Sequence, residues 1–226
     1  MAITTTDLRV GGSPEGYDAL FVAKLAREHG APILHIARDD RRAAAMADAL
    51  TFFAGDIPVF SFPAWDCTPY DRVGPNTDIS ARRMATLAAL ADGWCGAAII
   101  LATVNAVTLR TPARAQIKDS SWTAAVDTRV DVDGLISYLT RSGFNRATTV
   151  MEAGDFAQRG GIVDIFPPGA ATPVRLDFFG DVLDGVRRFE VEGQRTIERI
   201  KRVELAPATE APLDPEAIKR FRAGYR

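Results

Sequence analysis

Apolar residues follow helical and strand-like spacings in turn over residues 15–104. Apolar positions recur at helical intervals over residues 15–29, 39–53 and 78–90, and Gly30 and Gly55 mark two of the ends. Asp39 or Asp40 is the expected cap of the second helix, and Asp78 that of the third. Short apolar runs at 31–37, 59–62 and 97–104 predict buried strands. Buried strands that alternate with helices favour a parallel sheet covered on both faces.

The pattern changes after Pro112. Residues 126–144 predict a strand and then a helix from Asp133 to Ser142 that ends at Gly143. Residues 161–191 form several short alternating runs separated by turns at 167–169 and 180–181, which is typical of antiparallel strands. A last helix is expected from Asp214 as cap and Pro215 as first residue. Because nothing follows to cover that helix, we expect the chain to be part of a longer one.

Residues 174–179, Val-Arg-Leu-Asp-Phe-Phe, carry the strongest functional signal. In a strand, Arg175, Asp177 and Phe179 share one face and the three other side chains share the opposite, apolar face. An aromatic residue among charges on one strand face suggests an exposed docking surface, because interfaces favour Arg and rigid aromatic anchors. The alternative is that Phe179 tucks under a neighbouring loop or helix.

Composition excludes several classes of protein. With 226 residues, 47% hydrophobic and 25% charged, the chain is long enough for one large or two small domains and is not a disordered protein. The net charge is −2, and basic residues do not outnumber acidic ones over 116–205, which argues against tight, non-specific duplex DNA binding. We expect no membrane span and no signal peptide, hence a cytoplasmic protein.

Metal and nucleophile sites are not expected. His29 and His35 do not pair with Cys67 or Cys95 at ligand spacing, and the two cysteines are expected to be buried thiols in a reducing compartment. His29 is expected at a helix end and His35 in a strand. No Ser-His-Asp or Cys-His set stands out, so we expect no catalytic residue.

A glycine pair near the start has the spacing of a phosphate-binding loop. Gly11 and Gly16 match G-x-x-x-x-G between a candidate strand and a helix, but Tyr17 and Asp18 stand where the motif requires Lys and Ser or Thr. Lysine would contact the phosphates and the hydroxyl would bind magnesium, whereas Asp18 would repel a phosphate. An ordinary turn explains the glycine spacing equally well. On either interpretation we expect no ATP binding and no cofactor here.

Two longer segments resemble a known family. FPAWDCTPYDRVGPNTDISARRMATL (62–87) and MEAGDFAQRGGIVDIFPPGAATPVRLDFFGDVLDGVRRFEVEGQRTIERI (151–200) look like the N-terminal, UvrB-like module of bacterial transcription-repair coupling factors (Mfd). The second segment is also similar to the excision-repair helicase UvrB. The resemblance covers nearly the whole chain, with residues 1–6 the least certain.

The resemblance implies an α/β fold. Domain 1A, residues 1–115, would be a RecA-like parallel-sheet domain with a degenerate nucleotide loop. An inserted α+β domain 2, residues 116–208, would bind UvrA, and residues 209–226 would be a linker and the first helix of domain 1B. RNA polymerase, duplex DNA, ATP and magnesium would be bound by other parts of the full-length translocase, so this chain would not be an enzyme.

The resemblance also supplies the partner-binding residues. Arg159, Arg175 and Phe179 match the UvrA-contacting positions of the family. Arg159 precedes Gly160 and Gly161 and could equally be a turn residue. The closest rival is a fragment of a UvrB-type ATP-dependent helicase that binds damaged DNA, but the Gly11–Asp18 loop lacks its lysine and no aromatic-rich hairpin is found between Phe60 and Val104. The resemblance further implies that the UvrA-binding face is masked in the resting full-length protein.

Overall fold

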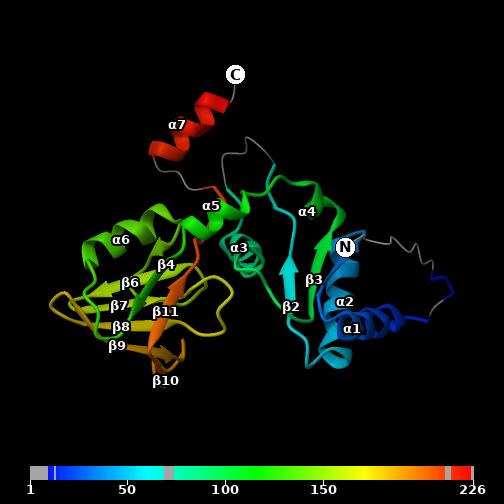
Figure 1. Ribbon diagram of the computed structural model, residues 1–226, viewed down its shortest axis with the longest axis horizontal. Coiled ribbons are helices and arrows are strands. Elements are labelled where there is room, and N and C mark those ends of the chain that lie inside the picture. Colours follow the sequence, from blue (N-terminus) through cyan, green and yellow to red (C-terminus); the bar gives the residue numbers. More distant parts are fainter. Residues whose placement is uncertain (1–9, 13, 69–73, 212–214, 225–226) are drawn as a thin grey trace.

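The computed structural model describes residues 10–12, 14–68, 74–211 and 215–224, which form two groups of elements (Figure 1). The first group contains a three-stranded sheet of β1 (Pro32–Ala37), β2 (Val59–Phe62) and β3 (Ala98–Thr103). Its strand order is β1-β3-β2, and both pairs are parallel. β3 lies in the centre and every one of its residues is buried. The prediction of a parallel sheet is therefore confirmed.

Helices cover the two faces of this sheet unequally. α1 (Tyr17–His29) and α2 (Asp40–Phe53) share an apolar core with Ile99 and Leu101. α3 (Thr77–Ala91) covers the opposite face, where Leu87 and Leu90 pack with Phe62 and Ile100. The short helices α4 (Val104–Thr108) and α5 (Arg114–Asp119) follow.

Strand β1 corrects the expectation of a fully buried strand at residues 31–37. β1 is an edge strand, and Leu34 and Ile36 are exposed on the face that carries Ile100. The physical reason is that α3 packs against β2 and against Ile100 of β3, whereas β1 is covered mainly by α1 and α2 on the other face. A run of apolar residues in sequence thus does not distinguish a central strand from an edge one.

The helix caps differ in one case from the prediction. Asp39 caps α2, and its side chain accepts a hydrogen bond from the Arg42 amide at 2.8 Å, as predicted. The prediction that Asp78 caps α3 is wrong, because Asn76 is the cap and accepts from the Asp78 amide at 2.9 Å. Asp78 instead lies in the first turn, where its charge suits the helix dipole.

The second group is built on a six-stranded sheet. Its strands are β5 (Asn145–Arg146), β6 (Asp155–Arg159), β7 (Ile162–Ile165), β8 (Val174–Phe179), β9 (Val182–Phe189) and β10 (Thr196–Ile200). They lie in the order β10-β9-β8-β7-β6-β5, and all pairs are antiparallel except β5 with β6. A separate antiparallel pair joins β4 (Trp122–Ala125) to β11 (Arg202–Leu205).

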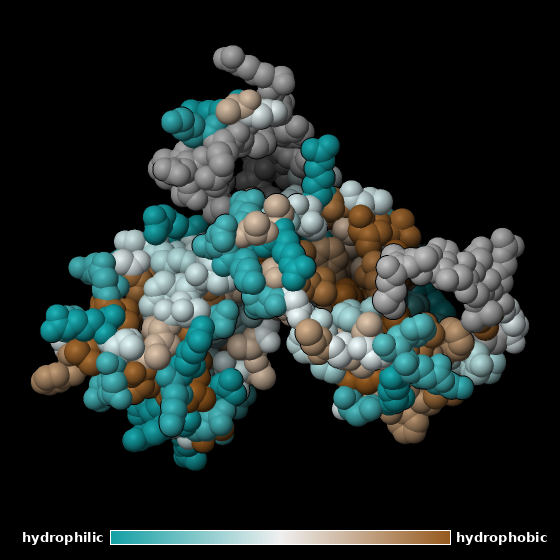
Figure 2. All heavy atoms as spheres, viewed as in Figure 1, coloured by the Kyte–Doolittle hydropathy of each residue, from teal (hydrophilic) through white to brown (hydrophobic). Residues whose placement is uncertain are grey.

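The core of this group lies between one face of the six-stranded sheet and the remaining elements. Leu135 and Leu139 of α6 (Val132–Arg141) are fully buried against Phe156, Val163 and Leu176 of the sheet. The opposite face, which we call the outer face, carries charged residues of β7, β8 and β9. Figure 2 shows hydrophobic and hydrophilic residues interspersed over both groups on the side in view. The last helix is α7 (Pro215–Gly224), and its expected cap Asp214 lies outside the described residues.

The strand expected at the start of residues 126–144 is misplaced. The strand is β4, four residues long and ending at Ala125, whereas Asp127 has a φ of 65°, a left-handed conformation that ends the extended run. Val126, Val130 and Val132 still pack against the core, which explains the strand-like apolar signal. The helix expected from Asp133 to Ser142 agrees with α6 to within one residue at each end.

The two groups meet around α3. A turn of the second group packs against this helix so closely that a Cβ placed on Gly169 would lie 2.3 Å from the Cβ of Ala85. Arg83, also on α3, forms a buried ion pair with Glu210, which follows β11. The expectation of two buried thiols is wrong, because Cys95 is exposed and Cys67 is only partly buried.

Candidate functional site: the outer face of the six-stranded sheet

Strand β8 presents its side chains in the predicted alternation. Val174 and Leu176 are buried and Phe178 packs against the core, while Arg175 and Asp177 lie on the outer face. The turn into β9 is tight, because Phe179 pairs with Val182. The register shifts by one residue, as in a β-bulge, where β9 lies opposite Asp177 and Phe178. A rigid central strand therefore holds the outer-face residues in fixed register.

Phe179 is exposed over 84% of its surface, so the alternative in which it tucks under a loop or helix is excluded. It is followed by Gly180, whose φ of 63° belongs to a tight turn that favours glycine. An aromatic ring that is exposed to solvent at the end of a strand contributes little to the hydrophobic core of its own fold. This position is typical of a side chain that is buried by a partner.

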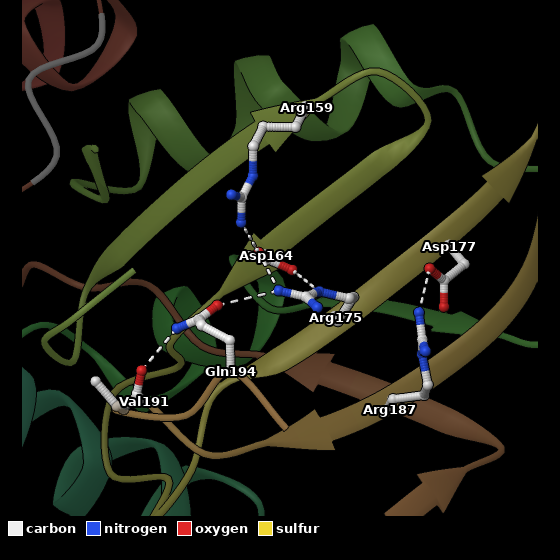
Figure 3. Close-up of polar contacts among 7 residues, drawn as sticks. All are labelled: Arg159, Asp164, Arg175, Asp177, Arg187, Val191 and Gln194. Carbon is white, nitrogen blue, oxygen red and sulfur yellow. Dashed lines mark hydrogen bonds and ion pairs between the residues drawn. The ribbon is translucent and has the colours of Figure 1, made fainter. Parts of the chain in front are cut away.

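Asp164 of β7 is the centre of the charged network (Figure 3). It lies directly opposite Arg175 in the antiparallel ladder and is only 1% exposed. Arg175 donates to its two oxygens, from Nε at 2.6 Å and from Nη2 at 2.8 Å, and Arg159 donates from Nη2 at 2.9 Å. The hydrogen bond to Asp164 raises the pKa of Arg175 above its ordinary value. One buried carboxylate thus orients two guanidinium groups.

Arg175 is held from two further sides. Its guanidinium lies over the ring of Phe189, 4.6 Å from the ring centre, and donates to the Gln194 side chain at 3.1 Å. Gln194 has a φ of 53° and donates in turn to the carbonyl of Val191 at 2.8 Å, so the loop between β9 and β10 folds onto Arg175. The Arg175 side chain is 17% exposed, which corrects the expectation that it lies open on the surface.

Arg159 is the more accessible arginine. It is the last residue of β6, followed by the turn at Gly160 and Gly161, and its side chain is 54% exposed. The sequence left open whether it belonged to a strand or a turn. The structure places it at the end of a strand and brings it to the same carboxylate as Arg175.

A second ion pair on this face was missed by sequence reasoning. Arg187 of β9 lies opposite Arg175 and donates to Asp177 at 2.7 Å. Two arginines directly opposite each other repel, and Asp177 reduces that repulsion. Among the described residues the Arg187 Nε is buried without an acceptor. Aspartate and arginine residues occur in both β8 and β9, but the sequence does not show which of them face each other. The pairing of Arg187 with Asp177 can be inferred only when the register of the two strands is known.

The segment from Gly11 to Asp18, described except for residue 13, leads into α1. Gly16 precedes α1 with a φ of 82°, and Tyr17 stacks on Phe21 with ring centres 6.5 Å apart. The Asp18 carboxylate lies 3.6 Å from Arg42 of α2, so a negative charge stands at the helix start, where a phosphate would need positive charge. The strand expected before Gly11 lies outside the described residues.

The histidines lie apart, at a helix end and in a strand. His29 is the last residue of α1 and His35 lies in β1, as predicted. Burial lowers the pKa of His35. No group of three or more His, Cys, Asp or Glu residues that could bind a metal is found in the described part of the chain. Over the same residues, no helix is long and apolar enough to cross a membrane.

Comparison with known protein families finds a match within the second group of elements. The family model described as "UvrB interaction domain" matches residues 123–210, which contain the entire outer face. The chain is 34% identical over 208 residues to the transcription-repair-coupling factor of Escherichia coli K12, covering 92% of this chain and 18% of that protein. Its counterpart in Myxococcus xanthus is 35% identical over 211 residues, with 89% and 18% covered.

A third relative, the transcription-repair-coupling factor of Haemophilus influenzae, is 30% identical over 217 residues. That match covers 96% of this chain and 19% of the relative, so the chain spans less than one fifth of the length of these relatives. The chain is therefore similar over most of its length to one part of the transcription-repair-coupling factors, and residues 123–210 match the UvrB interaction domain.

Proposed function

We propose that this chain is the UvrA-recruiting module of a transcription-repair coupling factor, and that it links stalled RNA polymerase to nucleotide excision repair. The observation that carries the proposal is the outer face. Phe179 stands exposed at the end of the strand that carries Arg175, and Arg159 and Arg175 share Asp164, all within the segment that matches the UvrB interaction domain. Aromatic and arginine side chains on a rigid strand face suit a protein partner. The coupling-factor relatives favour this reading over a fragment of a UvrB-type helicase.

Binding to UvrA from the same organism tests this proposal. We expect calorimetry to detect binding of the 226-residue chain, with Phe179→Ala or Arg175→Ala weakening it about 30-fold or more, the typical cost of removing an interface anchor. Phe52→Ala is the matched control, because Phe52 is equally exposed, at 84%, but lies on α2 of the first group. Arg38→Ala serves the same purpose for arginine. No binding by the wild-type chain, or equal losses in the controls, would refute the proposal.

We infer that this chain has no nucleotide chemistry of its own. Its first group would be a RecA-like domain, domain 1A over residues 1–115, whose loop at Gly11–Asp18 is degenerate. The Asp18–Arg42 ion pair supports this inference. In a thermal-shift experiment with magnesium and ATP we expect no change in the melting temperature, whereas a clear stabilisation would contradict the inference.

The remaining activities belong to the rest of the coupling factor in this proposal. Contacts with RNA polymerase and duplex DNA, and ATP-driven translocation in the bacterial cytoplasm, would need segments outside this chain. We also propose that another segment of the full-length protein masks the UvrA-binding face at rest. The 226-residue chain should then bind UvrA more tightly than the full-length protein does without nucleotide, and equal affinities would refute the masking.

A further inference from the structure

Arg159 and Arg175 share a single oxygen atom of Asp164. Their Nη2 atoms lie 2.9 and 2.8 Å from Oδ2, so the two nitrogens can be no further apart than the sum of these distances. Two cations held this close would repel without the carboxylate between them. The spacing of the two guanidinium groups is therefore set by Asp164, which is itself inaccessible to a partner because it is buried.

Gln194 further restricts the orientation of the Arg175 guanidinium. The guanidinium rests on Phe189, which is fully buried although it lies on the outer face, and Gln194 closes the loop over it. Nε and Nη2 of Arg175 donate to Asp164 and Gln194, and Nη1 donates no hydrogen bond within the described residues. The orientation of Arg175 is thus determined before any partner arrives.

We propose that Asp164 and Gln194 are positioning residues of the UvrA-binding face, and that they act through Arg159 and Arg175 without contacting UvrA. This inference rests on the proposed function. A free arginine loses much side-chain entropy when a partner orders it, and an arginine already held by the fold avoids that loss on binding. The chain therefore orders its two arginines during folding.

For Asp164→Asn, simple charge attraction and positioning predict opposite changes in the affinity for UvrA. Asp164→Asn removes a negative charge from beside two arginines, so a partner attracted only by positive charge should bind it more tightly. Positioning predicts weaker binding, because the amide no longer holds both guanidinium groups by charge-assisted hydrogen bonds. The direction of the change separates the two explanations.

The binding experiment compares four chains by calorimetry with UvrA: wild type, Asp164→Asn, Gln194→Ala and Asp177→Asn. We expect about a tenfold loss for Asp164→Asn and about a threefold loss for Gln194→Ala, because Asp164 accepts three hydrogen bonds from the two arginines and Gln194 accepts one. Asp177→Asn is the matched control, since it removes the same charge from the same face but frees only Arg187. Unchanged or tighter binding by Asp164→Asn, or an equal loss in Asp177→Asn, would overturn the proposal. Where Asp164→Asn does not fold, the Gln194→Ala result decides.

A measurement on the free chain separates this inference from the proposed function. In nitrogen-15 NMR spectra we expect the Arg175 Nε–H, bonded to Asp164 at 2.6 Å, to give a sharp signal protected from exchange with water. That signal should be lost in Asp164→Asn and kept in Asp177→Asn. If the signal is absent from the wild type, the positioning role is wrong even where UvrA binds. If the signal behaves as expected but the wild type does not bind UvrA, the proposed function fails instead.

Discussion

Arg83 of α3 and Glu210, which follows β11, form a buried bidentate ion pair between the two groups of the fold. Both residues of the pair also form hydrogen bonds with other residues. Arg83 also donates to the Pro63 carbonyl at 2.7 Å, and the Trp65 indole donates to Glu210 at 3.2 Å. The centre of the Phe62 ring lies 4.1 Å from the guanidinium carbon of Arg83. Burial of both charges is tolerated because each nitrogen of the Arg83 guanidinium and each carboxylate oxygen of Glu210 takes part in a hydrogen bond.

Breaking this pair from one side should destabilise the fold strongly. We expect Glu210→Ala to lower the free energy of unfolding by about 3–5 kcal/mol, because Arg83 is left as an unpaired buried charge. Denaturation in urea measures the change. The exposed pair of Lys24 and Glu28 is the control, and Glu28→Ala should cost no more than about 0.5 kcal/mol. Equal effects of the two substitutions would contradict the prediction.

The cap of α3 gives a second prediction. Asn76→Ala removes the acceptor of the Asp78 amide and should cost about 1 kcal/mol, whereas Asn76→Ser keeps an oxygen in that position and should cost much less. Urea denaturation of both variants provides the measurement. If the serine and alanine variants prove equally destabilised, the hydrogen bond from the Asp78 amide to the Asn76 side chain does not account for the contribution of Asn76 to stability.

Gly169 should be far less tolerant than Gly180, although both have positive φ values, 75° and 63°. Gly180→Ala meets no atom within 4 Å and should cost about 1–2 kcal/mol from backbone strain alone. Gly169→Ala adds a clash with Ala85 on α3 and should cost about 2–4 kcal/mol. Combining Gly169→Ala with Ala85→Gly should recover part of the loss of unfolding free energy. A double variant less stable than Gly169→Ala would rule out the clash.

The hydroxyl of Tyr138 makes stability depend on alkaline pH. It lies 3.0 Å from the carbonyls of Ser120 and Leu205, and burial raises its pKa to about 12. The folded state favours the neutral phenol, so its contribution is complete below pH 10 and is lost as the pH rises from 10 to about 12. Urea denaturation between pH 8 and 12 should show this fall, by up to about 1.4 kcal/mol per pH unit.

Tyr138→Phe is the matched variant for the alkaline effect. It should be less stable at pH 8 by about 1–3 kcal/mol, because the carbonyls of Ser120 and Leu205 lose the hydroxyl hydrogen that they share, and it should lack the part of the alkaline fall that Tyr138 causes. The absorbance of ionised tyrosine offers a second measurement, in which a titration step near pH 12 should be present in the wild type and missing from Tyr138→Phe. A wild type and variant with the same pH dependence would contradict the assignment.

Local patterns were enough to predict much of this fold. The period of apolar residues located α1, α2 and α6, and the alternation in residues 174–179 correctly separated the core side of β8 from its outer side. These features depend on neighbouring residues, which a sequence displays directly. The sequence left two alternatives for Phe179, exposed or tucked under a neighbouring segment, and only the structure shows that it is exposed.

Features that depend on distant residues could not be predicted. Arg175 was expected to be exposed, but Phe189 at the end of β9 and Gln194 in the loop after it, both more than ten residues later in the chain, pack against its guanidinium. Asp164 looked like one polar residue of a strand until the register placed it opposite Arg175. Likewise, Leu34 and Ile36 read as buried because the sequence does not say which strand lies at the edge.

The pair of Arg83 and Glu210 also bears on how the chain folds during synthesis. The two residues are 127 positions apart, whereas the parallel sheet joins strands within the first half of the chain. A ribosome adds roughly 5–20 residues per second, so α3 emerges several seconds or more before its carboxylate partner. During that interval Arg83 has no counter-charge from Glu210. The early half of the nascent chain should therefore remain loosely packed around α3 until the segment after β11 has been made.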